Sequence, residues 1–153
     1  VVSPTTTITR ADKPTVLVQA HDNETGVADQ TIQLDATTTL QSGSIIDPLF
    51  LSLGQHTLAV SAIDFVGNTA STTYLFNIIA TPTSTLVDIE RAYELGWIDT
   101  LANRNYLMQY ILRSTIGSLW GLRSTIRQWF ESGIITREGF DVLWEDVNWL
   151  LTH

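Results

Sequence analysis

The feature that most constrains this 153-residue sequence is an uneven division of residue types along the chain. All five tryptophans follow residue 96, whereas all four prolines precede residue 83. Two short domains of different class explain this division better than one mixed domain. We therefore predict a first domain over residues 1–80, a linker over 81–84 and a second domain over 85–153, each marginally stable alone.

The overall composition narrows the classes of function. With 44% hydrophobic and 16% charged residues the chain has the composition of a folded protein. No apolar run approaches the roughly 18 residues of a membrane span. A net charge of −8 with a single lysine argues against a nucleic-acid surface, which needs clustered cations. The absence of cysteine excludes disulfides and thiolate metal sites.

The first half shows the two-residue period of β-strands. Residues 69–79 place Ala70, Tyr74 and Ile78 on one face, and residues 55–64 and 14–21 alternate in the same way. Ile8 and the segment around residues 32–34 mark further strands. About seven short strands at this spacing predict an all-β immunoglobulin-like sandwich.

Two motifs in this half resemble bacterial extracellular immunoglobulin-like repeats. Residues 54–69 contain a G-x-H-T-L strand followed by A-x-D-x-x-G-N, and residues 20–27 read A-x-D-x-x-x-G-V. The resemblance covers about residues 3–79. It implies a stalk, spacer or adhesive module on a secreted or surface protein.

The second half contains a duplicated pattern. Residues 93–99 and 130–136 share the order aromatic-Glu-x-Gly-x-Ile-(Asp or Thr), 37 residues apart. Gly96 and Gly133 suit the left-handed position that ends a helix, and Asp99 and Thr136 suit the N-cap of the next helix. Thr85 and Asp88 offer a capping box for an earlier helix. With apolar stripes on either side, this predicts an all-α four-helix bundle of two hairpins.

Residues 86–98 and 133–151 resemble the FIMAH module, a helical module found near the C-termini of secreted bacterial enzymes and surface proteins. The family pattern is roughly G-x-I-x-x-E-A-x-x-L-x-x-D-A-x-x-L, and Gly139 and Val147 stand here where Ala is usual. The resemblance covers about residues 84–151 and implies no catalytic residue.

Calcium is the metal that the sequence favours most. Asp22, Asn23, Glu24 and Asp64 are oxygen donors in expected loops, the ligand type that a hard cation prefers. The alternative is that Asp22 and Asp64 cap their own turns and stay hydrated. No other cofactor is expected.

An interaction patch is expected on the last helix. On a helical projection Val142 and Trp149 lie opposite the apolar stripe, and Trp120 lies at the edge of its own stripe. The group that covers this patch remains open among the rest of this chain, another protein and a sugar ring.

We therefore expect a non-enzymatic pair of modules from a larger secreted or cell-surface bacterial protein. Its partner would be the rest of the parent chain or another surface protein, with no nucleic acid and no membrane span. One alternative is a polysaccharide-binding accessory of a secreted glycan-active enzyme. Another is a self-assembling subunit of a surface layer or filament. The chain begins with Val rather than Met, which suggests a segment of something longer.

Overall fold

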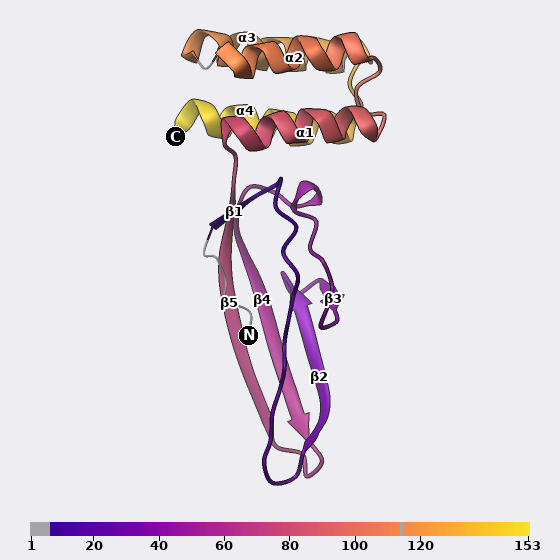
Figure 1. The fold of residues 1–153 in the computed structure, drawn as a ribbon, viewed down its shortest axis with the longest axis vertical. Helices are drawn as coiled ribbons and strands as arrows, with labels where there is room; N and C mark the ends of the chain where they lie inside the picture. The colour runs from indigo at the N-terminus through magenta and orange to yellow at the C-terminus, as the bar shows by residue number, and fades with distance from the viewer. Residues whose placement is uncertain (1–6, 114) are drawn as a thin grey trace. The chain divides into compact units, whose positions relative to one another are not determined.

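The computed structural model describes residues 7–113 and 115–153, in which the chain forms five strands and four α-helices (Figure 1). The strands are β1 (Thr7–Thr9), β2 (Val27–Leu34), β3 (Thr38–Leu40), β4 (Gly54–Asp64) and β5 (Thr69–Ile79). The helices are α1 (Pro82–Glu94), α2 (Leu101–Arg113), α3 (Ile116–Glu131) and α4 (Arg137–Thr152), and a short 3-10 helix, η1, covers Pro48–Phe50.

The five strands form one sheet in the order β1-β5-β4-β2-β3. The pairs β2–β3, β2–β4 and β4–β5 are antiparallel. Because side chains alternate along a strand, the register aligns Leu34 with Leu58 and Ile32 with Val60 on a single buried face.

The expected fold class, an immunoglobulin-like sandwich followed by a separate four-helix bundle, is wrong. The described chain has one five-stranded sheet and four helices, an α/β composition, and no second sheet opposes the first among the described residues.

The physical reason for the missing second sheet lies in residues 14–21, which were expected to form a strand and do not. Val16 is buried, but its backbone bonds only to the loop at Gly43 and Ser44. The next backbone groups are satisfied by side chains, since Val18 pairs with the Ser42 hydroxyl and the Ala20 N–H donates to Gln30. Side-chain partners replace the strand ladder that a second sheet needs.

The described residues divide into two compact units that do not follow the chain in order. The sheet unit contains residues 7–8, 13–47 and 54–78. The helical unit contains residues 79–153 together with residues 9–12 and 48–53. The helices therefore do not pack as a bundle of residues 85–153 alone, because two segments of the first half belong to their unit.

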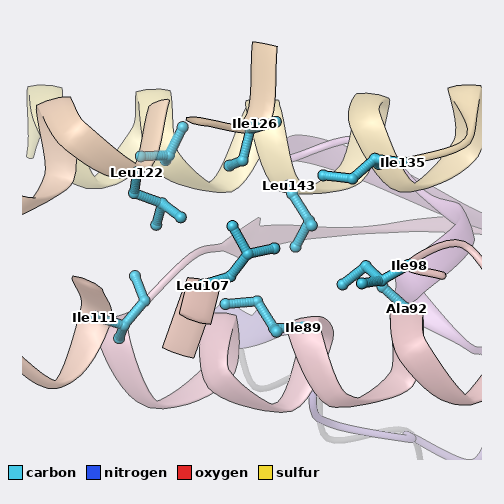
Figure 2. Close-up of a cluster of buried hydrophobic side chains, with 10 residues drawn as sticks. Ile89, Ala92, Ile98, Leu107, Ile111, Leu122, Ile126, Ile135 and Leu143 are labelled. Atoms are coloured by element: carbon cyan, nitrogen blue, oxygen red, sulfur yellow. The ribbon is translucent and has the colours of Figure 1, made fainter. Parts of the chain in front are cut away.

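Within the helical unit each helix packs against two others, in the pairs α1–α2, α2–α3, α3–α4 and α1–α4 (Figure 1). Figure 2 shows apolar side chains from these helices and their connecting loops pointing into the space between them. The buried cluster consists of Ile89, Ala92, Ile98, Leu107, Ile111, Leu122, Ile126, Ile135, Leu143 and Val147.

The duplicated loops close the two hairpins as expected. Gly96 and Gly133 have φ values of 73° and 78°, a conformation that favours glycine. Ile98 and Ile135 form an antiparallel bridge, so the two copies of the motif pair with each other. Both isoleucines are buried in the core cluster.

The helix caps agree with the sequence only in part. Thr136 caps α4 as expected. The expected N-cap of α2, Asp99, is wrong: this helix begins after Thr100, whose hydroxyl accepts a hydrogen bond from the Asn103 N–H.

Helix α1 begins earlier than expected. Its N-cap is Thr81, which forms a capping box with Ser84, and Pro82 is the first helical residue. The structure thus places the first turn of a helix where the sequence suggested a linker. The Thr85 and Asp88 box was wrong, because both residues are buried inside α1.

Candidate functional site

A turn at residues 9–12 places Arg10 inside the helical unit. Asp12 Oδ2 accepts hydrogen bonds from the Thr9 N–H at 2.7 Å and the Thr9 hydroxyl at 2.8 Å, which close the turn. The Arg10 side chain is only 2% exposed, although long cations are rarely buried unless they are paired.

Every nitrogen of the Arg10 guanidinium donates to a partner. Nε and Nη2 donate to the Leu51 carbonyl at 3.3 and 2.9 Å. Nη1 donates to the Val142 carbonyl at 3.1 Å and to Asp146 Oδ1 at 2.5 Å, and Nη2 pairs with Glu145. Val142, Glu145 and Asp146 share one face of α4 because helix positions three and four apart are neighbours. Arg10 therefore joins residues 9–12, residues 48–53 and α4.

Asp88 of α1 and Asp146 of α4 form a carboxyl pair beside this arginine, and both residues are 0% exposed. Among the described residues no N–H group or hydroxyl donates to either Asp88 oxygen or to Asp146 Oδ2. The Asp146 charge disfavours ionisation of Asp88, so the pair favours a proton on one of its two carboxyl groups. Arg10, Asp88, Glu145 and Asp146 are called the Arg10 cluster below.

Burial governs the titration of the carboxyl pair. The pKa of Asp88 is raised to about 8, first by burial and second by the Asp146 charge, against the lowering effect of Arg10. Burial also raises the pKa of Asp146 to about 6, against the lowering effect of Arg10. Asp88, which has the higher pKa of the two, therefore keeps a proton near neutral pH.

A cleft of about 580 Å³ lies beside the Arg10 cluster in the helical unit. Phe50 and Trp97 meet edge to face at its wall, with ring centroids 6.0 Å apart. Trp144 and Asn148 also line it, and Glu145 connects it to the cluster.

A row of stacked aromatic and arginine side chains runs along α3 and α4. Phe140 stacks on Phe130 at 4.4 Å and on Trp144 at 5.2 Å, each with near-parallel rings. Arg123 lies over Trp144 at 4.5 Å and over Trp120 at 5.3 Å. We call this row, which Arg137 extends over Phe130, the α3–α4 ladder.

The ladder ends on an exposed face of α3. Trp120 is 53% exposed and Ile116, four residues earlier, is 69% exposed. Arg123 follows three residues after Trp120, and its Nε donates to Asn148 Oδ1 at 2.7 Å. Ile116, Trp120 and Arg123 therefore line one face of the helix at the spacing i, i+4 and i+7.

The structure separates the residues of the expected interaction patch. Val142 is only 9% exposed, so its expected exposure is wrong: residues 9–12 and 48–53 cover this side of α4. Trp149 is half-buried, lines a different cleft near Pro82 and stacks on His153 with ring centroids 4.2 Å apart. Trp120 is exposed, and a contact through Trp120 or Trp149 stays a prediction.

The expected calcium ligands lie in two turns of the sheet unit. The Thr25 hydroxyl donates to Asp22 Oδ2 at 2.7 Å and to Asp64 Oδ2 at 3.0 Å, which brings the two turns together. Asn23 and Glu24 are exposed in the first turn. No group of three metal-binding side chains occurs among residues 7–113 and 115–153. Calcium binding here stays a prediction.

The carboxylates of these turns already have local donors. The Asp22 pKa lies below its ordinary value, chiefly because the Glu24 N–H donates to the carboxylate. For Asp64, desolvation raises the pKa, but hydrogen bonds from Asn68, Thr25 and Val66 outweigh it and lower the pKa overall.

His56, in the G-x-H-T-L motif, pairs with a carboxylate of the β2–β3 turn. Its Nδ1 lies 2.6 Å from Asp35 Oδ2, its ring stacks on Phe76, and it is 5% exposed. Asp35 Oδ1 accepts from the Thr57 N–H at 2.8 Å. Desolvation raises the Asp35 pKa, but the bonds from His56 and Thr57 lower it below its ordinary value overall. The histidine thus anchors a turn.

Sequence reasoning missed Arg10, Asp88 and Asp146. The two aspartates carry no periodic signal, because each lies outside the apolar stripe of its own helix and yet is buried in the fold. Arg10 carries none either, since 136 residues separate it from Asp146.

None of the described helices is long and apolar enough to cross a membrane. Comparison with protein-family models, with curated proteins and with solved structures gives no match to this chain.

Proposed function

We propose that this chain is a non-catalytic spacer and attachment segment of a larger secreted or cell-surface bacterial protein. It contacts a partner protein through the exposed face of α3. The observation that carries the proposal is the alignment of Ile116, Trp120 and Arg123 on that face, at the end of the α3–α4 ladder.

The residue types suit a protein contact. Trp and Arg are the residues most enriched among those that dominate binding energy. Arg123 is held between two indole rings and by Asn148, so it loses little side-chain freedom when a partner binds. The exposed Ile116 widens the apolar part of the surface.

The sheet unit supports the spacer role. Strands β4 and β5 have 11 residues each, which is about 36 Å of extended chain. They pair along nearly their whole length, from Gly54 with Ile78 to Ile63 with Thr69. A long continuous hairpin keeps its ends at a fixed separation.

The test is selection of a phage-displayed random peptide library against the chain, with counter-selection against Trp120→Ala. We expect peptides whose affinity falls about 30-fold in Trp120→Ala, the loss of a typical dominant contact. Arg127→Ala, which removes an exposed arginine of the same helix, is the matched control and should leave binding unchanged. Peptides that bind both variants equally would contradict the proposal.

A carbohydrate-binding role is the second candidate, and the exposed indole of Trp120 favours it because a sugar ring can lie against such a surface. Affinity electrophoresis of the chain in gels that contain single polysaccharides separates the two functions. Retardation that Trp120→Ala abolishes would replace the protein partner by a glycan.

Self-assembly is the remaining alternative, and analytical ultracentrifugation tests it. Concentration-dependent sedimentation that Trp120→Ala reverses would assign the α3 face to a second copy of the chain. A single species at all concentrations is the expected result.

A further inference from the structure

The contact surface on α3 does not use the buried carboxyl pair of the Arg10 cluster. Asp88 and Asp146 come from different helices, both are 0% exposed, and the only described side chain that donates a hydrogen bond to the pair from outside it is Arg10. Burial of such groups costs several kcal/mol per ion, so a purely structural core would avoid them. Their presence calls for a separate explanation.

Several charged groups act on the pair. Arg10 faces it from residues 9–12, and Arg91 of α1 also stabilises the ionised form of Asp88. Glu145 of α4 opposes ionisation of Asp146. With one proton on the pair, Arg10 bonds to the Asp146 carboxylate and also pairs with Glu145, whose side chain is 38% exposed.

Among the described residues of the other covering elements, no further titratable group hydrogen-bonds to the pair. Residues 48–53 have no ionisable side chain and contribute the Leu51 carbonyl. On α2, Arg104 pairs with Glu90 at 3.0 Å. The ionisation of Asp88 would therefore place a second negative charge in a buried site that holds one arginine.

We propose that the Arg10 cluster is a proton-dependent latch: one proton held between Asp88 and Asp146 keeps residues 9–12 and 48–53 seated on α4, and loss of that proton to solvent releases them. This inference goes beyond the proposed function, because it concerns a conformational change and involves neither Trp120 nor its partner.

The direction of release follows from where water can enter. Two ionised carboxylates side by side repel each other and need hydration. The remaining surroundings of the pair are the packed helices, whereas Arg10 and Glu145 line the cleft on the side of residues 48–53. Movement of these two short segments admits water without disrupting the apolar core. The raised pKa of Asp88, about 8, places the change near or just above neutral pH.

The experiment follows the whole chain by nuclear magnetic resonance from pH 5 to pH 9. Carboxyl carbon shifts report the protonation of Asp88 and Asp146. The Arg10 Nε–H signal and the exchange of the Leu51 amide, which donates to the Pro48 carbonyl at 3.1 Å, report whether the segments are seated. We expect both structural signals to change at the pH where the pair loses its proton.

Asp88→Asn supplies the decisive comparison, because asparagine can still donate to Asp146 but cannot ionise. At pH 9, about one pH unit above the midpoint, the deprotonated wild-type pair exceeds the protonated pair about tenfold. We therefore expect the Leu51 amide to exchange at least about tenfold more slowly in Asp88→Asn than in the wild type. Comparison at equal pH removes the effect of pH on exchange chemistry. Asp141→Asn, whose side chain is 61% exposed on the same helix, is the matched control and should behave as the wild type.

The latch is refuted if Arg10 and Leu51 keep their protection while the pair deprotonates. It is equally refuted if the pair stays protonated to pH 9 or if Asp88→Asn loses protection as the wild type does. Should Asp88→Asn not fold, the wild-type titration decides alone: coincident midpoints support the latch and separate midpoints overturn it.

Discussion

The sheet unit and the helical unit use carboxylates in opposite ways. In the sheet unit, Asp22, Asp35 and Asp64 accept hydrogen bonds in turns, and the net effect is a pKa below the ordinary value for each. In the helical unit, Asp88 and Asp146 lie in the core, where burial raises the pKa of both. Aspartate side chains thus close turns in the sheet unit, whereas in the helical unit burial favours a protonated aspartate.

The difference shows how sequence separation relates to burial. Asp22 and Asp64 receive most of their bonds from donors only two to four residues away, such as Glu24 and Asn68, whereas the donors of Asp35 lie 21 and 22 residues away on β4. The helical carboxylates depend on Arg10, which is 136 residues from Asp146. A hydrogen bond within a turn forms whenever the turn forms. A buried group that depends on one distant side chain loses its partner completely when that side chain is replaced. The helical unit should therefore be the more sensitive of the two to single substitutions.

The largest effect is expected for Arg10→Ala, which leaves Asp146 and the Leu51 and Val142 carbonyls without their donor. We expect the free energy of unfolding of the helical unit to fall by about 3–5 kcal/mol at pH 7. Urea unfolding followed by tryptophan fluorescence measures this unit selectively, because all five tryptophans belong to it.

Lys13→Ala is the control for this experiment. It removes an exposed cation of the sheet unit three residues after Arg10, and it should change the unfolding midpoint little. Equal losses in both variants would show that general charge, rather than the Arg10 cluster, stabilises the helical unit.

Gly139→Ala should be the next largest change. A Cβ at this position would lie 2.9 Å from Trp97 Cβ and 3.0 Å from Ile135 Cγ2, so the two repeated loops leave no room for it. We expect a loss of about 1–3 kcal/mol by the same fluorescence measurement.

Gly117→Ala on α3 is the matched variant, because a Cβ there meets no atom within 4 Å. It should leave the helical unit as stable as before or slightly more stable. If Gly139→Ala leaves the stability of the helical unit unchanged, the repeated loops adjust easily to the added methyl group. Close packing would then not make the helical unit more sensitive than the sheet unit.

A smaller effect is expected for Asp35→Ala in the sheet unit. It removes the acceptor of His56 Nδ1 and of the Thr57 N–H, for an expected loss of about 1–1.5 kcal/mol at pH 7. Amide exchange along β4 reports the change. A loss as large as that of Arg10→Ala would contradict the contrast between the units.

The smallest effect is a gain for Ala36→Gly. Ala36 follows Asp35 in the β2–β3 turn with φ of 55°, a region that disfavours residues with a Cβ. We expect about 0.5–1 kcal/mol of added stability in the sheet unit, read from the same β4 amides. A loss of stability would show that the alanine methyl contributes packing that outweighs its strain.

Local patterns account for what could be predicted from the sequence. The alternation over residues 69–79 matches β5, and the duplicated glycines end α1 and α3 as expected. These features depend on neighbours within a few residues. Residues 14–21 alternate equally well, but they form no strand. An alternating pattern does not reveal whether the backbone of a segment will find a neighbouring strand to pair with.

The candidate site was less predictable for a related reason. A helical projection shows which side of α4 carries the apolar stripe. It cannot show that residues 9–12 and 48–53 cover the opposite side and bury Val142. The place of Trp120 at a stripe edge could be read from the sequence because it is a local property, and the structure leaves this side chain exposed. Arg10 was not, since its partners come together only in the folded helical unit.

The most direct test of the central claim is the free energy of unfolding of the helical unit, measured by tryptophan fluorescence between pH 5 and pH 8.5. The Asp88 pKa is raised from 3.8 to about 8 on folding, so the stability it contributes is complete below its unfolded pKa and is lost as pH rises through its folded pKa. We predict that wild-type stability falls with pH, and that Asp88 contributes a slope of at most about 1.4 kcal/mol per pH unit to this fall. In Asp88→Asn the slope should be much smaller, leaving the contribution of Asp146 near pH 6. Wild-type stability that stays constant or rises over this range would contradict the account.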